Sequence, residues 1–243
     1  EYGPLQDDGI AHFRVAGTGD LDKKATLADG VIYLPFWLLT YEDMVSIFVD
    51  RSDQNAPNQS MTLSRAVTTA KRKYLEANKQ KEVLANFTID SPVPYSLDDV
   101  LAELKALNTE MVEGSGGREK QGEFHGRLSR FIARLENKRT DRRLGFMFAG
   151  GKECDDWNWL PKLAKALMAG RRDQDKKKGG IKIVDFSEVP SDILPLVIGL
   201  VARLIFSVQQ WSKTENRQPI ALFCDEAHLY LPNRADADSS AGA

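Results

Sequence analysis

The last part of the chain alternates short apolar segments with helical ones, and this pattern constrains the fold more than any other feature. After Arg143 the sequence reads as strand LGFMFAG, helix WNWLPKLAKALMAG, strand IKIVDFS, helix SDILPLVIGLVARLIFSVQQW and strand PIALFCDE. Strands joined through helices of this length require parallel crossovers. We therefore predict an α/β fold with a parallel sheet that helices cover on both faces.

A helical region precedes this alternation. Three stretches between Ser60 and Thr140 show helical spacing of apolar residues, and Ser96 with Asp99 forms a predicted capping box for the second one. The stretch Gly114–Lys120 reads as a flexible connector between two helices. The stretches are SMTLSRAVTTAKRKYLEANKQ, SLDDVLAELKALNTEM and GEFHGRLSRFIARLENKRT.

These patterns predict three parts of the chain. Residues 1–57 and 141–243 form the α/β core, and residues 58–140 form a helical-bundle insertion. In the first part, Pro35 within VIYLPFWLL argues against a central strand, so we expect an irregular path into the core.

Composition narrows the function classes. The net charge of -2 and pI of about 6.0 give no global basic field, so any contact with nucleic acid must come from local patches or from a ring. Two cysteines cannot make a disulfide framework, and we expect Cys224 to be a reduced thiol packed inside a strand in a reducing cytosol. The longest apolar segment is interrupted by Arg203 and is shorter than a membrane span, so no membrane partner is expected.

The acid pair Asp225 and Glu226 follows an apolar run, at the strand end where parallel sheets bind ligands. Adjacent acids there suit phosphoryl transfer to water, with Asp225 holding hydrated Mg²⁺ and Glu226 orienting the water. The alternative is a strand that ends on two solvated acids. Asp185, after IKIVD, is a rival metal ligand, although a contact with Ser187 is the favoured interpretation.

The histidines and cysteines show no metal-ligand spacing, and the motif HExxH is absent. His228 could sense a γ-phosphate or pack under the sheet. Arg142 and Arg143 are expected to form ion pairs.

A P-loop would need G-x-x-x-x-G-K-[ST], and the sequence contains none. The nearest match is FMFAGGKE, where Glu153 stands in place of the hydroxyl residue and would repel phosphate.

The run RRDQDKKK is the strongest local basic segment. It is expected to be a solvated loop, yet in a ring it could touch DNA phosphates without reading sequence. Its basic residues are Arg171, Arg172, Lys176, Lys177 and Lys178.

The order EYG, LPFWLLT, helical insert, DRRLGFMF, VDFS and CDEAH resembles HerA-type ATPases of the HerA and FtsK class. The resemblance implies a RecA-like core interrupted by a helical bundle. Because an acidic segment ending in GEY follows the P-loop region in that family, a phosphate loop is expected ahead of Glu1.

The resemblance also implies a function. Family members form hexameric rings that pump double-stranded DNA with ATP and Mg²⁺, often with a partner nuclease or a defence effector, in the prokaryotic cytoplasm. Asp225 then matches the Walker B acid and Glu226 the catalytic glutamate. Asp185 and His228 are further candidate nucleotide contacts from their positions in the sequence, not from the resemblance. The trans-acting arginine is expected beyond Ala243, so the chain alone should not hydrolyse ATP.

Two alternatives stay open. One is a non-catalytic RecA-like scaffold that binds partner subunits, which would show no stabilisation by nucleotide. The other is a DEAH-type RNA helicase, which only the four letters DEAH suggest and against which the helical insert counts.

Overall fold

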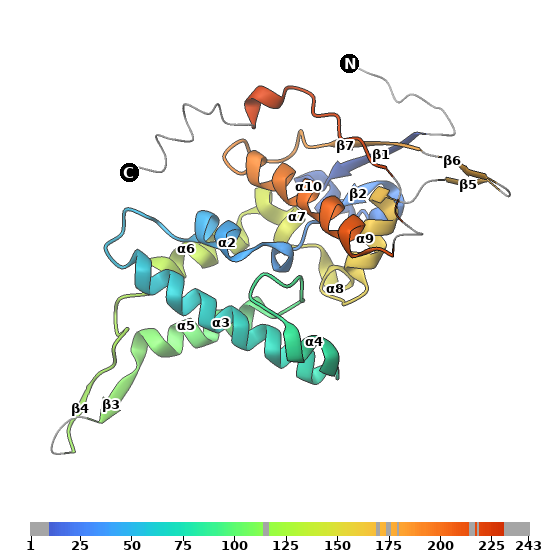
Figure 1. Cartoon of the computed structure of the whole chain (residues 1–243). Helices are drawn as coiled ribbons and strands as arrows, with labels where there is room; N and C mark the ends of the chain where they lie inside the picture. Colours follow the sequence, from blue (N-terminus) through green and yellow to red (C-terminus); the bar gives the residue numbers. More distant parts are fainter. Residues whose placement is uncertain are drawn as a thin grey trace. The chain divides into compact units, whose positions relative to one another are not determined.

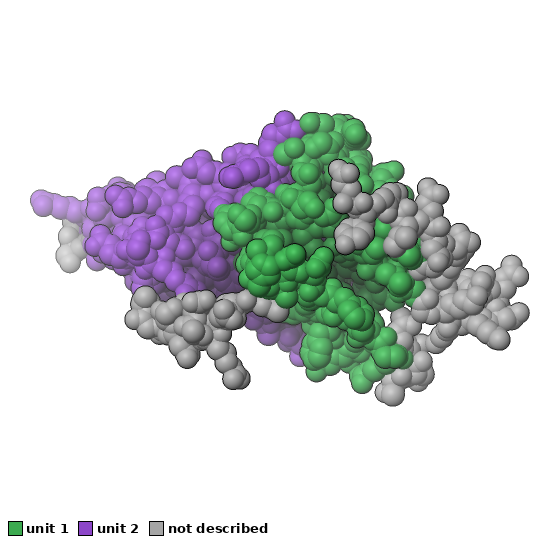
Figure 2. All heavy atoms as spheres, turned by 90° about the horizontal axis from the view of Figure 1, so that it is seen from above, with its two compact units in different colours: residues 1–32, 158–243 green, residues 33–157 purple. Residues whose placement is uncertain are grey.

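The computed structural model describes residues 10–113, 117–168, 171–173, 176–178, 180–213, 217 and 219–230, with only the backbone for 171–173 and 176–178. The chain divides into two compact units (Figure 2). Unit 1 consists of residues 1–32 and 158–243, and unit 2 of residues 33–157. The three-part division at residues 58 and 141 stays a prediction.

A three-stranded parallel sheet lies in unit 1 (Figure 1). Its strand order is β2-β1-β7, with β1 at Ile10–Val15, β2 at Val31–Ile32 and β7 at Ile181–Asp185. Both pairs are parallel, and the β1 and β7 ladder runs from Ile10 opposite Ile181 to Arg14 opposite Asp185. The predicted parallel α/β fold is therefore confirmed, and it is consistent with a RecA-like core.

Unit 1 also contains the helices that the sequence predicts on either side of β7. The predicted helices are present as α9 and α10, which contact each other, and Pro195 lies in the first turn of α10, where amide hydrogens need no helical partner. The segments are α1 (Thr18–Lys23), η1 (Leu27–Asp29), α9 (Trp159–Met168), α10 (Leu194–Trp211), η5 (Ala227–Leu229) and the antiparallel pair β5 (Arg171–Asp173) and β6 (Lys176–Lys178).

Unit 2 is mainly helical, with α3 in contact with α4 and α5, and α6 in contact with α2, α5 and α7. Its segments in chain order are η2 (Phe36–Leu38), α2 (Tyr41–Phe48), α3 (Ala56–Ala77), α4 (Lys81–Asn86), α5 (Leu97–Thr109), β3 (Met111–Glu113), β4 (Glu119–Gln121), α6 (Ser129–Thr140), η3 (Arg142–Leu144), α7 (Gly145–Phe148) and α8 (Gly151–Cys154).

The helix predictions hold for most of unit 2. Ser96 caps α5, since its side chain accepts a hydrogen bond of 3.2 Å from the amide of Asp99. The third predicted helix is shorter than expected because α6 begins at Ser129. The predicted connector is also partly wrong, because residues 119–121 form β4 and pair with β3, while residues 114–116 lie outside the described residues.

An aromatic cluster fills the core of unit 2. The ring of Phe36 lies edge-on to the ring of Tyr95, with 5.0 Å between the ring centres, and stacks on the ring of Phe148, with 5.7 Å between the centres. The indole of the buried Trp37 donates a hydrogen bond of 2.9 Å to the carbonyl oxygen of Cys154. The segment around Pro35 thus has the irregular, buried path that the sequence predicts.

The predicted strand LGFMFAG is wrong. Leu144 ends η3, and Gly145–Phe148 forms the single helical turn α7, in which Phe146 and Met147 are buried. Asp141 caps η3, which leads into α7, because its side chain accepts a hydrogen bond from the amide of Arg143 at 3.0 Å and also forms an ion pair with that arginine. A short apolar run does not distinguish a buried strand from a buried helical turn.

The predicted strand PIALFCDE is also wrong. Residues 219–224 form no strand ladder with the described residues, and Leu222 and Phe223 are exposed, Phe223 to 93 %. Cys224 is an exposed free thiol rather than a packed one, whereas Cys154 is the buried cysteine. A strand depends on its partner for hydrogen bonds, so an apolar segment without a partner stays irregular.

Helix α10 meets the length and composition of a membrane span, with a mean hydropathy of 1.5 over 18 residues. The core helix of a soluble protein can meet the same criteria. This helix contacts α9 through part of its surface, and Val197, Leu200, Val201 and Leu204 are buried.

A buried lysine forms hydrogen bonds with the backbone of the loop before α5. The ammonium group of Lys71 on α3 donates hydrogen bonds of 2.6 Å to the carbonyl oxygens of Ile89 and Ser91, and lies 5.6 Å from the ring centre of Tyr95. Burial lowers the pKa of Lys71 to about 8, against the opposing charge of Asp90. The lysine therefore favours its neutral form in the folded chain more than in the unfolded one.

Replacing this lysine should remove a pH dependence of stability. With a folded pKa near 8 and an unfolded value of 10.5, the unfolded chain binds more protons between these values. The free energy of unfolding should therefore rise from pH 8 to 10.5, by roughly 3 kcal/mol from Lys71 alone. Urea titrations of the unsubstituted chain and Lys71→Met across this range measure the difference, and parallel pH profiles would contradict the assignment.

Candidate functional site

The carboxyl edge of the parallel sheet is where an α/β fold binds its ligands. In unit 1 this edge is formed by the ends of β1 and β7, where Arg14 and Asp185 are register partners. The loops that follow carry Gly17 after β1 and Ser187 after β7. Polar side chains on these loops are therefore the first candidates for a site.

Asp185 ends β7 and points its carboxylate at its own loop. Its Oδ1 accepts a hydrogen bond of 2.8 Å from the amide of Ser187 and another from the Ser187 hydroxyl. The predicted contact with Ser187 is therefore present. Its charge also contributes to the raised pKa of Arg14, behind the larger effect of Asp20.

The loop after β1 is held by an ion pair that the sequence analysis missed. Arg14 donates to both carboxylate oxygens of Asp20, at 3.2 and 2.6 Å, and the amide of Gly17 donates to Asp20 Oδ2 at 3.1 Å. The hydrogen bond from Arg14 is the main reason that the pKa of Asp20 lies below its ordinary value. The pattern of β1 followed by AGTGD could have pointed to this turn.

Gly17 also allows a close approach within the same edge. A Cβ atom at this position would lie 2.5 Å from Oε2 of Glu188, on the loop after β7. Glu188 therefore lies directly over the first turn after β1. The loops that follow the two paired strands contact each other at a position where glycine provides the room.

The predicted acid pair lies in a tight, exposed turn. The side chain of Asp225 accepts a hydrogen bond of 2.9 Å from the amide of Glu226, and Nδ1 of His228 lies 3.3 Å from Oε2 of Glu226. The hydroxyl of Tyr230 donates to the carbonyl oxygen of Asp225. The structure thus brings Asp225, Glu226 and His228 together, and it adds Tyr230, which the sequence analysis did not select.

The predicted packing of His228 under the sheet is wrong, because its side chain is exposed. His228 lies beside Glu226, and its predicted role in contacting a nucleotide stays a prediction. Asp185 is not part of the same hydrogen-bonded group, since within the described residues no hydrogen bond or ion pair joins it to Asp225, Glu226 or His228.

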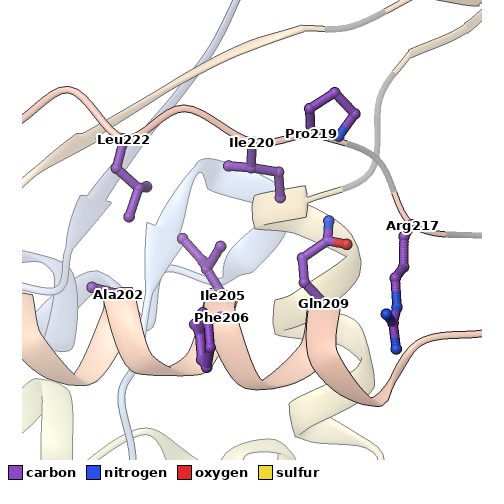
Figure 3. A pocket seen from close by; sticks show the side chains of 8 residues that line it. All are labelled: Ala202, Ile205, Phe206, Gln209, Arg217, Pro219, Ile220 and Leu222. Carbon is purple, nitrogen blue, oxygen red and sulfur yellow. The ribbon is translucent and has the colours of Figure 1, made fainter. Parts of the chain in front are cut away.

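A groove of about 500 Å³ lies where the segment before the acid pair runs along α10 (Figure 3). Ile220 and Leu222 point toward the helix, from which Ile205 and Gln209 project toward the segment. Residues 219, 220 and 222 thus line the groove together with α10, without strand pairing.

The basic run forms a short hairpin rather than a loop. Strands β5 and β6 pair antiparallel, with Arg171 opposite Lys178 and Arg172 opposite Lys177. The register therefore sets basic positions opposite basic positions. The fifth basic position, Lys176, is opposite Asp173.

The donor set of the acid pair suits Mg²⁺ that arrives with a nucleotide. Within the described residues, no group of three or more His, Cys, Asp or Glu side chains could hold a metal alone. Mg²⁺ commonly binds one or two carboxylates and completes its shell with water and substrate phosphates. Two exposed adjacent carboxylates meet that requirement.

Comparison with protein families gives a match to the family described as the central domain of helicase HerA, over residues 1–205. No curated protein matches the chain. The matched range includes Asp185 and the basic hairpin, whereas Asp225, Glu226 and His228 lie beyond it.

Removing the charge of Asp20 should loosen the loop after β1. Only 11 % of this side chain is exposed, so Asp20→Asn should lower the free energy of unfolding by about 1–2 kcal/mol through the loss of charge-assisted hydrogen bonds. Because the folded pKa is depressed, this contribution exists at neutral pH and disappears as the pH falls through the folded pKa.

Urea unfolding at pH 7 and in acid measures this effect. Glu76→Gln, on an exposed position of α3, is the matched control and should leave stability unchanged. An Asp20→Asn deficit that persists unchanged in acid would contradict the ion-pair explanation.

Proposed function

Because the chain belongs to the family of the HerA helicase central domain, we propose that it is part of an ATP-driven translocase of double-stranded DNA. The observation that carries the proposal is the turn formed by Asp225, Glu226 and His228. It presents two adjacent carboxylates to solvent, directly after an apolar segment that lines a groove together with a helix of the α/β unit.

The two carboxylates have different proposed roles, one in metal binding and the other in activating water. Mg²⁺, when bound with ATP, would neutralise charge on the phosphates. Asp225 would hold the hydrated ion through its carboxylate, of which one oxygen accepts a hydrogen bond from the amide of Glu226. Glu226 accepts the proton of the attacking water, and the imidazole of His228 beside it orients the carboxylate.

The basic hairpin is the proposed contact with DNA. Four basic residues occupy facing positions of the β5 and β6 ladder, and like charges on facing positions destabilise a strand pair. A phosphate backbone would relieve that repulsion and would be bound without regard to sequence. A hairpin of this composition therefore suits a protein that moves along DNA.

For assembly and cellular role, family membership is the only support. We propose a hexameric ring in the prokaryotic cytoplasm that works with a nuclease or a defence effector, in DNA end processing or phage defence. Asp185 is proposed as an additional nucleotide contact at the carboxyl edge of the sheet.

One observation favours a second function, that of a non-catalytic scaffold. The segment before the acid pair has no ladder partner in the described chain and exposes Phe223, as a binding surface for another subunit would. Addition of Mg²⁺ and ATP should raise the melting temperature of the translocase and leave that of a scaffold unchanged.

The first test is Glu226→Gln in the full-length protein. The variant should bind ATP with unchanged affinity and lose at least 99 % of DNA-stimulated hydrolysis, on the order of the 10² that a positioned base supplies. Phosphate release and nucleotide binding measure the two effects. Glu82→Gln, on the exposed surface of α4, is the control, and equal turnover in both variants would refute the role of Glu226.

The second test neutralises the hairpin by changing Arg171, Arg172, Lys176, Lys177 and Lys178 to Gln. DNA affinity should fall for all sequences alike, and the slope of log affinity against log salt should become shallower by roughly 0.9 for each lost phosphate contact. Titration of labelled duplexes over a range of salt measures both quantities. Lys79→Gln with Lys81→Gln is the control, and an unchanged slope would contradict the contact.

A further inference from the structure

Glu226 has a backbone conformation that its side chain disfavours. Its φ and ψ angles are 49° and 38°, in the left-handed region that residues other than glycine seldom occupy. Such a conformation persists only where surrounding interactions hold it, and residues of this kind gather at functional sites. Whatever holds this turn also sets the direction of the two carboxylates.

Two backbone hydrogen bonds from the residues after Glu226 hold one side of the turn. The amide of Leu229 donates to the carbonyl oxygen of Glu226 at 2.9 Å, and the amide of Tyr230 donates to that of Ala227 at 3.2 Å. These bonds close the short helical turn η5, and neither of them reaches Asp225.

The side chain of Tyr230 reaches back to Asp225. Its hydroxyl donates a hydrogen bond of 2.5 Å to the carbonyl oxygen of Asp225, five residues back. The peptide group that joins Asp225 to Glu226 is thereby fixed at its oxygen by Tyr230, and at its amide by the Asp225 carboxylate.

We propose that Tyr230 is a positioning residue, whose hydroxyl fixes the peptide between Asp225 and Glu226 and so directs both carboxylates. The proposal rests on the proposed ATPase function of that pair. Tyr230 has no part in the chemical step. It limits the directions in which the two carboxylates can point. A catalytic group that is misplaced by about 1 Å can lower the rate of the chemical step by two orders of magnitude.

The test is Tyr230→Phe in the full-length protein, which removes the hydroxyl and keeps the ring. Hydrogen exchange of the peptide covering residues 225–230 should become about fivefold faster, the effect of one lost hydrogen bond. The kcat for DNA-stimulated ATP hydrolysis should fall about tenfold while the KM for ATP stays unchanged, because the carboxylates act after binding.

Tyr41→Phe is the matched control. It removes a tyrosine hydroxyl for which the described residues provide no hydrogen-bond partner, so exchange and kcat should both stay at the unsubstituted values. A purely structural role for Tyr230 would lower the melting temperature but leave kcat unchanged below it.

The outcomes separate this proposal from the function on which it rests. Faster exchange with a lower kcat and constant KM supports the positioning role. An unchanged kcat in Tyr230→Phe, where Glu226→Gln abolishes turnover, overturns the positioning role alone. An unsubstituted full-length protein without ATP hydrolysis overturns both.

Discussion

Parallel pairing of β1 with β7 is the interaction on which the α/β unit depends. Its partners Ile10 and Ile181 are separated by most of the chain, so a long connection must close before the ladder can form. The entropy cost of such closure grows only slowly with length, which allows the connection to contain a folded helical unit of its own. The same pairing places the ends of both strands at one edge and makes that edge the natural place for chemistry.

Local signals in the sequence were sufficient for the longer helices α3, α5, α9 and α10. Ser96 marks the beginning of α5, and Pro195 marks the first turn of α10, because capping and proline effects act within a few residues. The strands were harder to predict. The sequence predicted β7 correctly but missed β1, and it assigned as strands two apolar segments, at residues 144–150 and 219–226, that form no ladder in the structure. Pairing is a long-range property that an apolar run does not encode by itself.

The site shows the same division between local and distant effects. The adjacency of Asp225 and Glu226 and the nearby His228 follow from the sequence, and they lie together in the structure because one turn contains all three. The ion pair of Arg14 and Asp20 is local, but it was missed because β1 was not identified as a strand. The position of Glu188 at the sheet edge could not be predicted in this way, because it depends on a contact between loops that are far apart in the chain.

The exposed edge of β7 has a consequence for handling the protein. In the described sheet β7 pairs only with β1, and Ile181 and Ile183 are exposed on the same strand, as are Phe206 and Phe223 elsewhere in unit 1. An open strand edge beside apolar side chains is a template for association with other chains. When this chain is produced by itself, it should therefore self-associate and precipitate as its concentration rises, while it is still folded. Short peptides that can add a strand to a sheet should compete with that self-association.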